Sequence, residues 1–177
     1  FGKGEYRYFK YPLPDLVAPP YDAVSGDERE RLLARSPYNV ARLTLPDSPE
    51  EAGRLYRGWL EEGILGPEDE PDSWLLVEGF VGPDGVARVR RGVIGSLTVT
   101  PYEAGVVLPH ERTHPRIREG RLRLLREMRA QPEPIFLLRE GALPVAIPER
   151  EPDLRADGSR LWRLGRDGLE ALTGGPL

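Results

Sequence analysis

The stretch Pro109-His110-Glu111-Arg112-Thr113-His114 gathers the side chains of this chain that could exchange protons or hold an anion. It contains both histidines of the sequence. A histidine changes charge near neutral pH, and a carboxylate beside it can act as a base or as a ligand for Mg²⁺. We therefore take His110 and Glu111 as candidate catalytic residues, and Thr113 as a candidate for binding substrate or phosphate. The structural alternative, in which these side chains only bond neighbouring loops, stays open.

The same residues spell the zinc motif H-E-x-x-H, from His110 to His114. That motif works on a helix, where residues four apart share a face. Pro115 disfavours helical backbone at His114, and no third ligand follows at a familiar spacing. We therefore predict no metal site built from these histidines, and a zinc-dependent hydrolase is the weakest of the functions considered.

An arginine-rich helix is predicted directly after this stretch. Residues 112–129 contain seven arginines and two glutamates, a sum of +5, whereas the rest of the chain holds 18 basic and 27 acidic residues, a sum of −9. Arg121 falls inside the apolar arc of the helix, and Arg123 and Arg126 point away from it. The arc is made by Ile117, Leu122, Leu124, Leu125 and Met128.

Arg121 needs an acceptor, because burying a guanidinium without a partner is costly. A structural carboxylate such as Glu103 or Glu111 could supply it. The phosphate or carboxylate of a ligand could supply it equally, since the planar guanidinium pairs well with both. Arg121 is therefore a candidate phosphate-binding residue. We do not expect the helix to bind nucleic acid, because lysines and interleaved aromatic residues are missing.

A second candidate lies at Pro19-Pro20-Tyr21-Asp22, just before a predicted helix. The start of a helix favours anions, so polar groups held beside it by two prolines could contact one. Asp22 is a candidate base or Mg²⁺ ligand, and Tyr21 a candidate binding residue. The structural alternative is a turn that begins the helix, with Asp22 stabilising the helix dipole.

The pattern of apolar, capping and turn residues predicts an α+β fold, with a mixed or antiparallel sheet and several short helices packed on it. Residues 5–24 are expected to be extended. Capping boxes begin helices after Ser25 and Ser48. Helices are predicted over 26–36, 49–62, 117–130 and 167–172. Strands are predicted over 39–45, 74–81, 86–100, 135–138, 144–148 and 161–164, with a turn at 83–85.

Composition narrows the function classes. The chain has 177 residues, a formal net charge of −4 and no cysteine. The absence of cysteine excludes disulfides, cysteine-bound metals and thiol catalysis. No apolar run approaches the length of a membrane span and no signal peptide is visible, so we expect a cytoplasmic protein. Arginine outnumbers lysine 23 to 2, which fits either a GC-rich genome or a heat-adapted source.

Several short blocks of the sequence, spread in order over nearly the whole chain, together match the pattern of one family. The combination of Pro19-Pro20-Tyr21-Asp22 with Pro109-His110-Glu111-Arg112-Thr113 is specific. Further blocks are Ser36-Pro37-Tyr38-Asn39, Trp59 to Leu65, Arg121-Leu122 and Pro134-Ile135-Phe136. With these blocks the sequence resembles the N-terminal half of the bacterial and archaeal family called domain of unknown function 1015. Gly120 departs from the family pattern, which has an acidic residue there, so no catalytic role is carried to it.

Members of that family are longer, and carry an Asp-Gly-His-His-Arg motif beyond a segment similar to residues 161–177. The resemblance therefore implies that residues 1–177 are a single domain or the N-terminal part of a larger α/β protein. Residues 150–177 would begin a second, ParB-like part. ParB-like proteins include nucleotide-dependent serine kinases, so the resemblance implies a nucleotide, Mg²⁺ and phosphoryl transfer to a small hydroxylated metabolite.

Two functional hypotheses follow. In the first, the protein is a nucleotide- or phosphate-dependent kinase or transferase. His110 and Arg121 then contact anionic groups, and Asp22 or Glu111 acts as base or Mg²⁺ ligand. In the second, it is a non-catalytic module that binds an anionic ligand or regulates another protein. The expected partners are a small molecule or nucleotide, and a second copy of the chain in a homodimer; neither membrane nor nucleic acid is expected.

Overall fold

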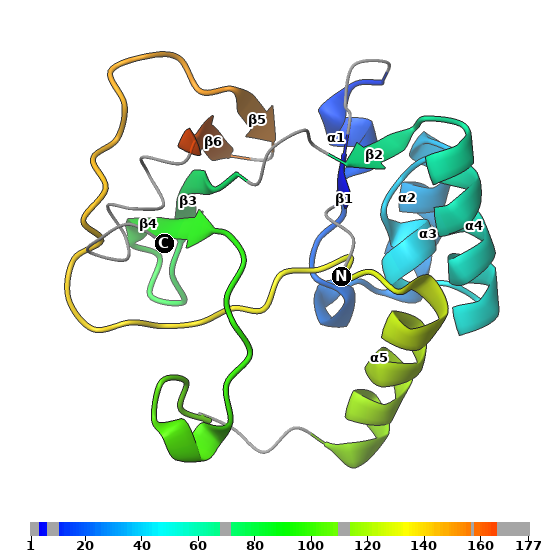
Figure 1. Cartoon of the computed structure of the whole chain (residues 1–177). Coiled ribbons are helices and arrows are strands. Elements are labelled where there is room, and N and C mark those ends of the chain that lie inside the picture. Colours follow the sequence, from blue (N-terminus) through cyan, green and yellow to red (C-terminus); the bar gives the residue numbers. More distant parts are fainter. Residues whose placement is uncertain (1–3, 7–10, 68–71, 110–113, 157, 166–177) are drawn as a thin grey trace.

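The computed structural model describes residues 4–6, 11–67, 72–109, 114–156 and 158–165 (Figure 1). Its helices are α1 (Leu13–Leu16), η1 (Tyr21–Ala23), α2 (Gly26–Arg35), α3 (Ala41–Thr44), α4 (Pro49–Glu61), η2 (Tyr102–Ala104) and α5 (Pro115–Met128). Its strands are β1 (Gly4–Tyr6), β2 (Leu65–Pro67), β3 (Trp74–Val81), β4 (Ala87–Ile94), β5 (Leu154–Ala156) and β6 (Ser159–Arg163). None of the described helices is both long and apolar enough to cross a membrane.

The strands form two antiparallel sheets, which confirms the expected α+β class. β1 pairs with β2, and a four-stranded sheet has the order β4-β3-β6-β5. Helices α2 to α5 gather on one side of the molecule and the four-stranded sheet lies on the other, as Figure 1 shows. The helices therefore pack mainly on one another. β6 pairs with β3, so residues near the C-terminal end share a sheet with residues 74–94.

Local signals place α2 and α4 where the sequence predicts them. The Ser25 hydroxyl accepts from the backbone N–H of Glu28 at 3.3 Å, and the Ser48 hydroxyl accepts from that of Glu51 at 3.2 Å. Each cap satisfies a backbone donor that the first helical turn leaves free. α4 is followed by Gly63, whose φ of +69° is the left-handed conformation that glycine adopts most easily.

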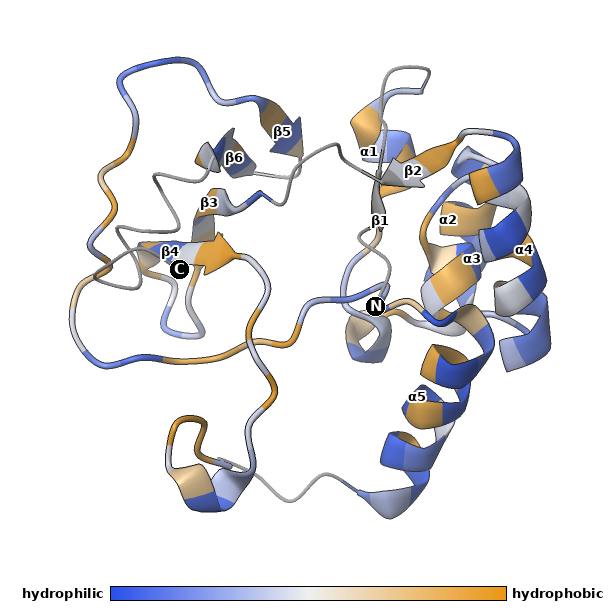
Figure 2. Cartoon of the chain, viewed as in Figure 1, coloured by the Kyte–Doolittle hydropathy of each residue, from blue (hydrophilic) through white to orange (hydrophobic). Residues whose placement is uncertain are grey.

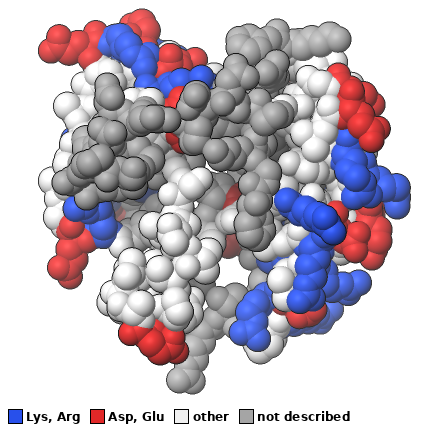
Figure 3. Space-filling view, in the orientation of Figure 1, with Lys and Arg blue, Asp and Glu red and all other residues white. Residues whose placement is uncertain are grey.

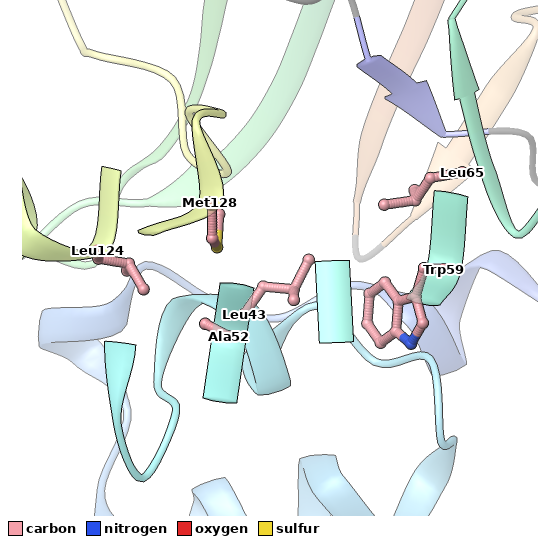
Figure 4. Close-up of a cluster of buried hydrophobic side chains, with 6 residues drawn as sticks. All are labelled: Leu43, Ala52, Trp59, Leu65, Leu124 and Met128. Carbon is pink, nitrogen blue, oxygen red and sulfur yellow. The ribbon is translucent and has the colours of Figure 1, made fainter. Parts of the chain in front are cut away.

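The main core lies between α3, α4 and α5 (Figure 4). α5 can approach α4 closely because Gly53 has no side chain. A Cβ atom at Gly53 would lie 2.9 Å from the carbonyl oxygen of Glu127. The buried members of this core are Leu43, Ala52, Trp59, Leu65, Leu124 and Met128. Two residues of the predicted arc of α5, Ile117 and Leu122, are instead exposed.

The prediction of a strand over 39–45 is wrong, because residues 41–44 form α3. Asn39 explains the difference. Its fully buried side chain donates to the carbonyl oxygens of Asp15 and Val17, and accepts from the N–H of Ala41. These bonds begin α3 and tie it to the end of α1, which itself interrupts the extended stretch predicted over 5–24. A short apolar run fits either helical or strand spacing, so its pattern alone could not decide.

A second, smaller core covers one face of the four-stranded sheet. Leu75, Val77 and Trp162 pack there against Val145, which comes from a segment without regular structure. Arg91 donates to the carbonyl oxygen of Val145 and holds this segment on the sheet.

Three other strand predictions differ from the structure. β4 ends at Ile94 and does not reach residue 100, and neither 135–138 nor 144–148 forms a strand. A strand needs a neighbouring strand for its backbone, and none of the described segments supplies one there. β6 confirms the strand predicted near 161–164, and β5 was missed. The helix predicted over 167–172 lies outside the described residues.

Candidate functional site

Arg121 lies in the middle of α5 and joins three separate parts of the chain. Its Nη1 donates to the carbonyl oxygen of Thr44 at 2.9 Å, and its Nη2 forms an ion pair with Glu133. Its Cζ lies 4.3 Å from the centre of the Tyr21 ring, which is a cation–π contact. The side chain is 27% exposed, so the guanidinium is partly buried and still reaches solvent.

Glu133 closes the cluster. One of its carboxylate oxygens pairs with Arg121, and the other accepts from the backbone N–H of Tyr21 at 3.3 Å. Tyr21 is the first residue of η1, and Pro20 directly before it is the N-cap. The Glu133 carboxylate therefore holds both the Arg121 guanidinium and the backbone of Tyr21, whose ring the guanidinium contacts. We call Tyr21, Arg121 and Glu133 the Arg121 site.

Burial lowers the pKa of the Arg121 guanidinium from its usual value, and the neighbouring Tyr21 opposes that shift. An arginine stays protonated in proteins, so the site keeps a positive charge at neutral pH. Since Glu133 carries the opposite charge, the pair is close to neutral. The arginines on the outer side of α5, Arg123 and Arg126, are exposed as predicted. Figure 3 shows blue side chains gathered on this side of the molecule.

The structure brings together two of the six candidate site residues. Tyr21 and Arg121, predicted separately as binding residues, contact each other. Asp22 follows Tyr21 in η1 and is exposed, and no hydrogen bond or ion pair within the described residues engages its carboxylate. His110, Glu111 and Thr113 lie outside the described residues.

A structural carboxylate accepts from Arg121, as one of the two alternatives predicted, but a different residue supplies it. Glu103 does not supply it, since Glu133 does. Sequence reasoning missed Glu133, although one signal was available. Glu133 is the only acidic residue between Met128 and Arg139, and it stands between two prolines directly after the arginine-rich helix.

His114, the last residue of the H-E-x-x-H motif, is not part of a helix. His114 has an extended backbone, with φ −59° and ψ 129°, and α5 begins only at Pro115. The extended backbone at His114 agrees with the prediction that Pro115 disfavours helix there. No group of three or more histidine and acidic side chains that could hold a metal occurs among the described residues. Asp22 can offer one carboxylate to Mg²⁺, which commonly takes one or two protein carboxylates together with substrate phosphates.

These features define an α+β protein in which a partly buried arginine joins a Pro-Pro-Tyr-Asp turn to a helix far along the chain. A family model described as "Protein of unknown function (DUF1015)" matches residues 4–152. The matched range includes every candidate site residue and Glu133, and the chain belongs to this family. Comparison with curated proteins found no match, and comparison with solved structures found none either.

Proposed function

We propose that the Arg121 site binds the anionic group of a small molecule, such as the phosphates of a nucleotide. A guanidinium has five N–H donors, and the contacts to Thr44 and Glu133 engage only its two terminal nitrogens, one donor each. Donors therefore remain without a partner within the described residues, on a side chain that solvent reaches. This spare donor capacity is the observation that carries the proposal, because phosphate and carboxylate are the anions that guanidinium pairs with best.

The proposal extends to a nucleotide- or phosphate-dependent kinase or transferase. Phosphoryl transfer depends mainly on positioning and on neutralising charge, which an arginine held in place by a carboxylate and a ring can provide. Asp22, whose exposed carboxylate has no partner within the described residues, would act as base or Mg²⁺ ligand. His110, Glu111 and Thr113 keep their proposed roles as phosphate contact, base and binding residue. The nucleotide and Mg²⁺ are part of this proposal only because of the resemblance to ParB-like proteins.

A non-catalytic anion-binding or regulatory module is the second candidate. The ion pair between Arg121 and Glu133 favours it, because the arginine already has a structural partner and a ligand would add to that contact without replacing it. Such a module needs the arginine and the tyrosine but no base. Replacing Glu111→Gln would then leave ligand binding unchanged, and an enzyme would lose turnover first.

Isothermal titration calorimetry of the full chain with ATP, ADP, CTP and pyrophosphate, each with Mg²⁺, tests the proposal. We expect heat of binding with at least one of them. Glu133→Gln should strengthen that binding several-fold, because the competing carboxylate is removed. Arg121→Lys should weaken it about tenfold, since an ammonium lacks the planar fork.

Arg126→Gln is the matched control, because Arg126 lies on the same helix and is exposed without a partner within the described residues. It should leave binding unchanged at moderate salt. Absence of heat with every nucleotide and with pyrophosphate would end the proposal. An effect of Arg126→Gln as large as that of Arg121→Lys would do so too, because it would show general attraction to a basic helix.

A further inference from the structure

A surface pocket of about 450 Å³ lies between α4 and the loop that precedes α3. Its volume is within the range of pockets that bind small molecules. One wall is formed by Pro37 and Tyr38, and the other by residues of α4 and its C-cap that recur every three or four positions and so share a helix face. Figure 2 shows both hydrophilic and hydrophobic residues along α4. We call this the α4 pocket; its helix wall consists of Glu51, Arg54, Leu55, Gly58, Trp59 and Glu62.

Gly58 gives the α4 pocket its depth. A Cβ atom at this position would meet nothing within 4 Å, so the space above the residue is open. Gly58 lies in the interior of α4, where glycine is less favourable than alanine. Neither packing nor backbone conformation requires a glycine here, and what the missing side chain provides is room in the pocket.

The apolar part of the pocket is held in place by stacked rings. The ring centre of Tyr38 lies 4.8 Å from that of Tyr11 and 5.7 Å from that of Trp59. Leu55 and Pro37 complete the apolar lining. Pockets that bind small molecules commonly combine such a preformed apolar surface with a few polar groups that orient the ligand.

Trp59 brings a hydrogen-bond donor without a partner to the pocket. The residue is 3% exposed, and no hydrogen bond within the described residues engages its indole N–H. The indole N–H of Trp162, by contrast, donates to the carbonyl oxygen of Arg150 at 2.9 Å. The described side-chain atoms that are both buried and unpartnered are three hydroxyl oxygens, so the Trp59 nitrogen reaches solvent, where Trp59 lines the pocket.

Figure 4 shows this nitrogen on the edge of the ring that faces away from Leu43 and Leu65. A buried tryptophan usually finds an acceptor for its N–H. A ligand in the α4 pocket that carries an acceptor oxygen would supply one.

Charged groups of both signs line the pocket and are available to a ligand. Within the described residues, neither the Arg54 guanidinium nor the Glu51 carboxylate forms a hydrogen bond or an ion pair. Glu62 accepts from the Tyr38 hydroxyl at 3.3 Å through one oxygen, which leaves its other oxygen open. The pocket therefore offers one guanidinium and two carboxylates beside the indole N–H.

We propose that the α4 pocket binds a free α-amino acid with an apolar side chain. The carboxylate of the amino acid would accept from the Trp59 indole and from Arg54, and its ammonium would donate to the two carboxylates of the pocket. Its side chain would lie over Gly58 and against Leu55. A simple anion would meet two carboxylates, and a simple cation would leave the indole N–H and the guanidinium without an acceptor, whereas a zwitterion satisfies both sets. This inference is independent of the Arg121 site.

Nuclear magnetic resonance of the ¹⁵N-labelled full chain, titrated with L-leucine, L-methionine and L-phenylalanine up to about 10 mM, tests the proposal. At least one of them should move the indole resonance of Trp59 in a saturable way and leave that of Trp162 in place, since Trp162 already has its acceptor. N-acetyl-L-leucine lacks the ammonium and L-leucinamide lacks the carboxylate, so each should bind at least about tenfold more weakly than L-leucine. No movement of the Trp59 resonance with any of the three amino acids would overturn the proposal.

Gly58→Leu should weaken binding at least about tenfold, because the new side chain would occupy the space of the ligand. The fold should persist, since a Cβ at this position meets nothing and leucine is a good helix former. Gly120→Leu is the matched control, because a Cβ at Gly120 on α5 also meets nothing within 4 Å, and it should leave binding unchanged. Equal effects of the two changes would contradict a site in the α4 pocket.

Removing one charge of each sign tests whether the ligand is bound as a zwitterion. Glu51→Gln and Arg54→Gln should each weaken binding several-fold, because each removes the partner of one end of the amino acid. Calorimetric titration of both variants with the amino acid that binds best measures this. Stronger binding by Arg54→Gln would show that the pocket selects a cation, and stronger binding by Glu51→Gln that it selects an anion; either result would overturn the proposal.

Discussion

The Arg121 guanidinium holds together residues that lie far apart in the sequence. Tyr21 and Glu133 are separated by 112 positions, and Thr44 and Arg121 by 77. The sequence identified Tyr21 and Arg121 separately, from the chemistry of their side chains. Glu133, their common partner, had only a weak signal: it is the one acidic residue between Met128 and Arg139, and that position does not record which arginine it meets.

Removing either partner of the Arg121–Glu133 pair should destabilise the protein. Arg121→Gln and Glu133→Gln should each lower the free energy of unfolding by about 1–2 kcal/mol, because a partly buried charge loses its partner. The double variant should show a coupling of roughly 1 kcal/mol. Urea unfolding of the four proteins measures this cycle.

Glu119→Gln on the exposed side of α5 is the control for that cycle, and should change stability by less than about 0.5 kcal/mol. Strict additivity of the two single changes would contradict the ion pair. It would leave Arg121 held by the Thr44 carbonyl and the Tyr21 ring alone.

The carboxylate of Asp84 is held by two neighbours in the turn between β3 and β4. Its carboxylate accepts from Arg88 at 2.6 Å and from the backbone N–H of Val86 at 3.2 Å. Both contacts favour the charged form and lower the pKa of Asp84 from 3.8 to about 2, chiefly through Arg88. A depressed pKa means that these contacts stabilise the hairpin above pH 3.8 and are lost as the pH falls through about 2.

Carboxyl NMR titration should therefore find the midpoint of Asp84 near pH 2. Arg88→Ala should move the midpoint up toward its ordinary value, because it removes the largest cause of the shift. Arg90→Ala should not move it, since Arg90 pairs with Glu78. A midpoint that stays low in the Arg88 variant would show that the backbone of the turn alone accounts for the shift.

At the scale of elements, the contact between α4 and α5 depends on the absence of a side chain at Gly53. The Glu127 carbonyl oxygen occupies the space that a Cβ atom would need. Gly58 lies in the same helix, and a Cβ there would meet nothing within 4 Å. One helix therefore contains a glycine that packing requires and a glycine that it does not.

The two glycines should respond oppositely to replacement by alanine. Gly58→Ala should raise the free energy of unfolding by up to about 1 kcal/mol, which is the helix preference of alanine over glycine. Gly53→Ala should lower it by about 1–3 kcal/mol, because α5 must move away from α4. Thermal unfolding followed by circular dichroism distinguishes them, and a stabilising Gly53→Ala would show that the helices are less closely packed than described.

Elements encoded by adjacent residues were predictable and those that depend on distant contacts were not. The capping boxes at Ser25 and Ser48 act within one turn, so α2 and α4 begin where expected. Asn39 reaches back to Asp15 and Val17, and this contact makes a helix of a segment whose pattern fits a strand. Residues 95–100 and 135–138 have strand composition, and pairing depends on a neighbour that their own sequence does not reveal.

At the scale of the whole molecule, the described residues form two separate hydrophobic cores. The helical core holds six buried residues and includes Trp59, and the sheet core holds four and includes Trp162. Because hydrophobic stabilisation rises with the area buried, the sheet core is expected to be the weaker of the two. Stability then varies between the two halves.

Tryptophan fluorescence can follow each half separately during unfolding. Trp59→Phe leaves only Trp74 and Trp162, both in the sheet, while replacement of those two by phenylalanine leaves only Trp59. We expect the sheet tryptophans to report a lower urea midpoint than Trp59. Coincident midpoints would contradict this expectation and show that the two cores unfold as one cooperative unit.

The order of the elements along the chain limits how this protein can be shortened, because Glu133 lies far from the residues that it holds. α1 to α4 precede the sheet strands β3 and β4, and α5 with Glu133 follows them. The helical half is thus formed by two separate stretches of the sequence, 11–67 and 114–133, and the β3–β4 hairpin lies between them in the sequence. A minimal helical protein cannot be obtained by trimming one end. It requires both stretches joined by a linker, and a cut before residue 133 would remove the carboxylate that holds the Tyr21 turn, 112 residues earlier in the sequence.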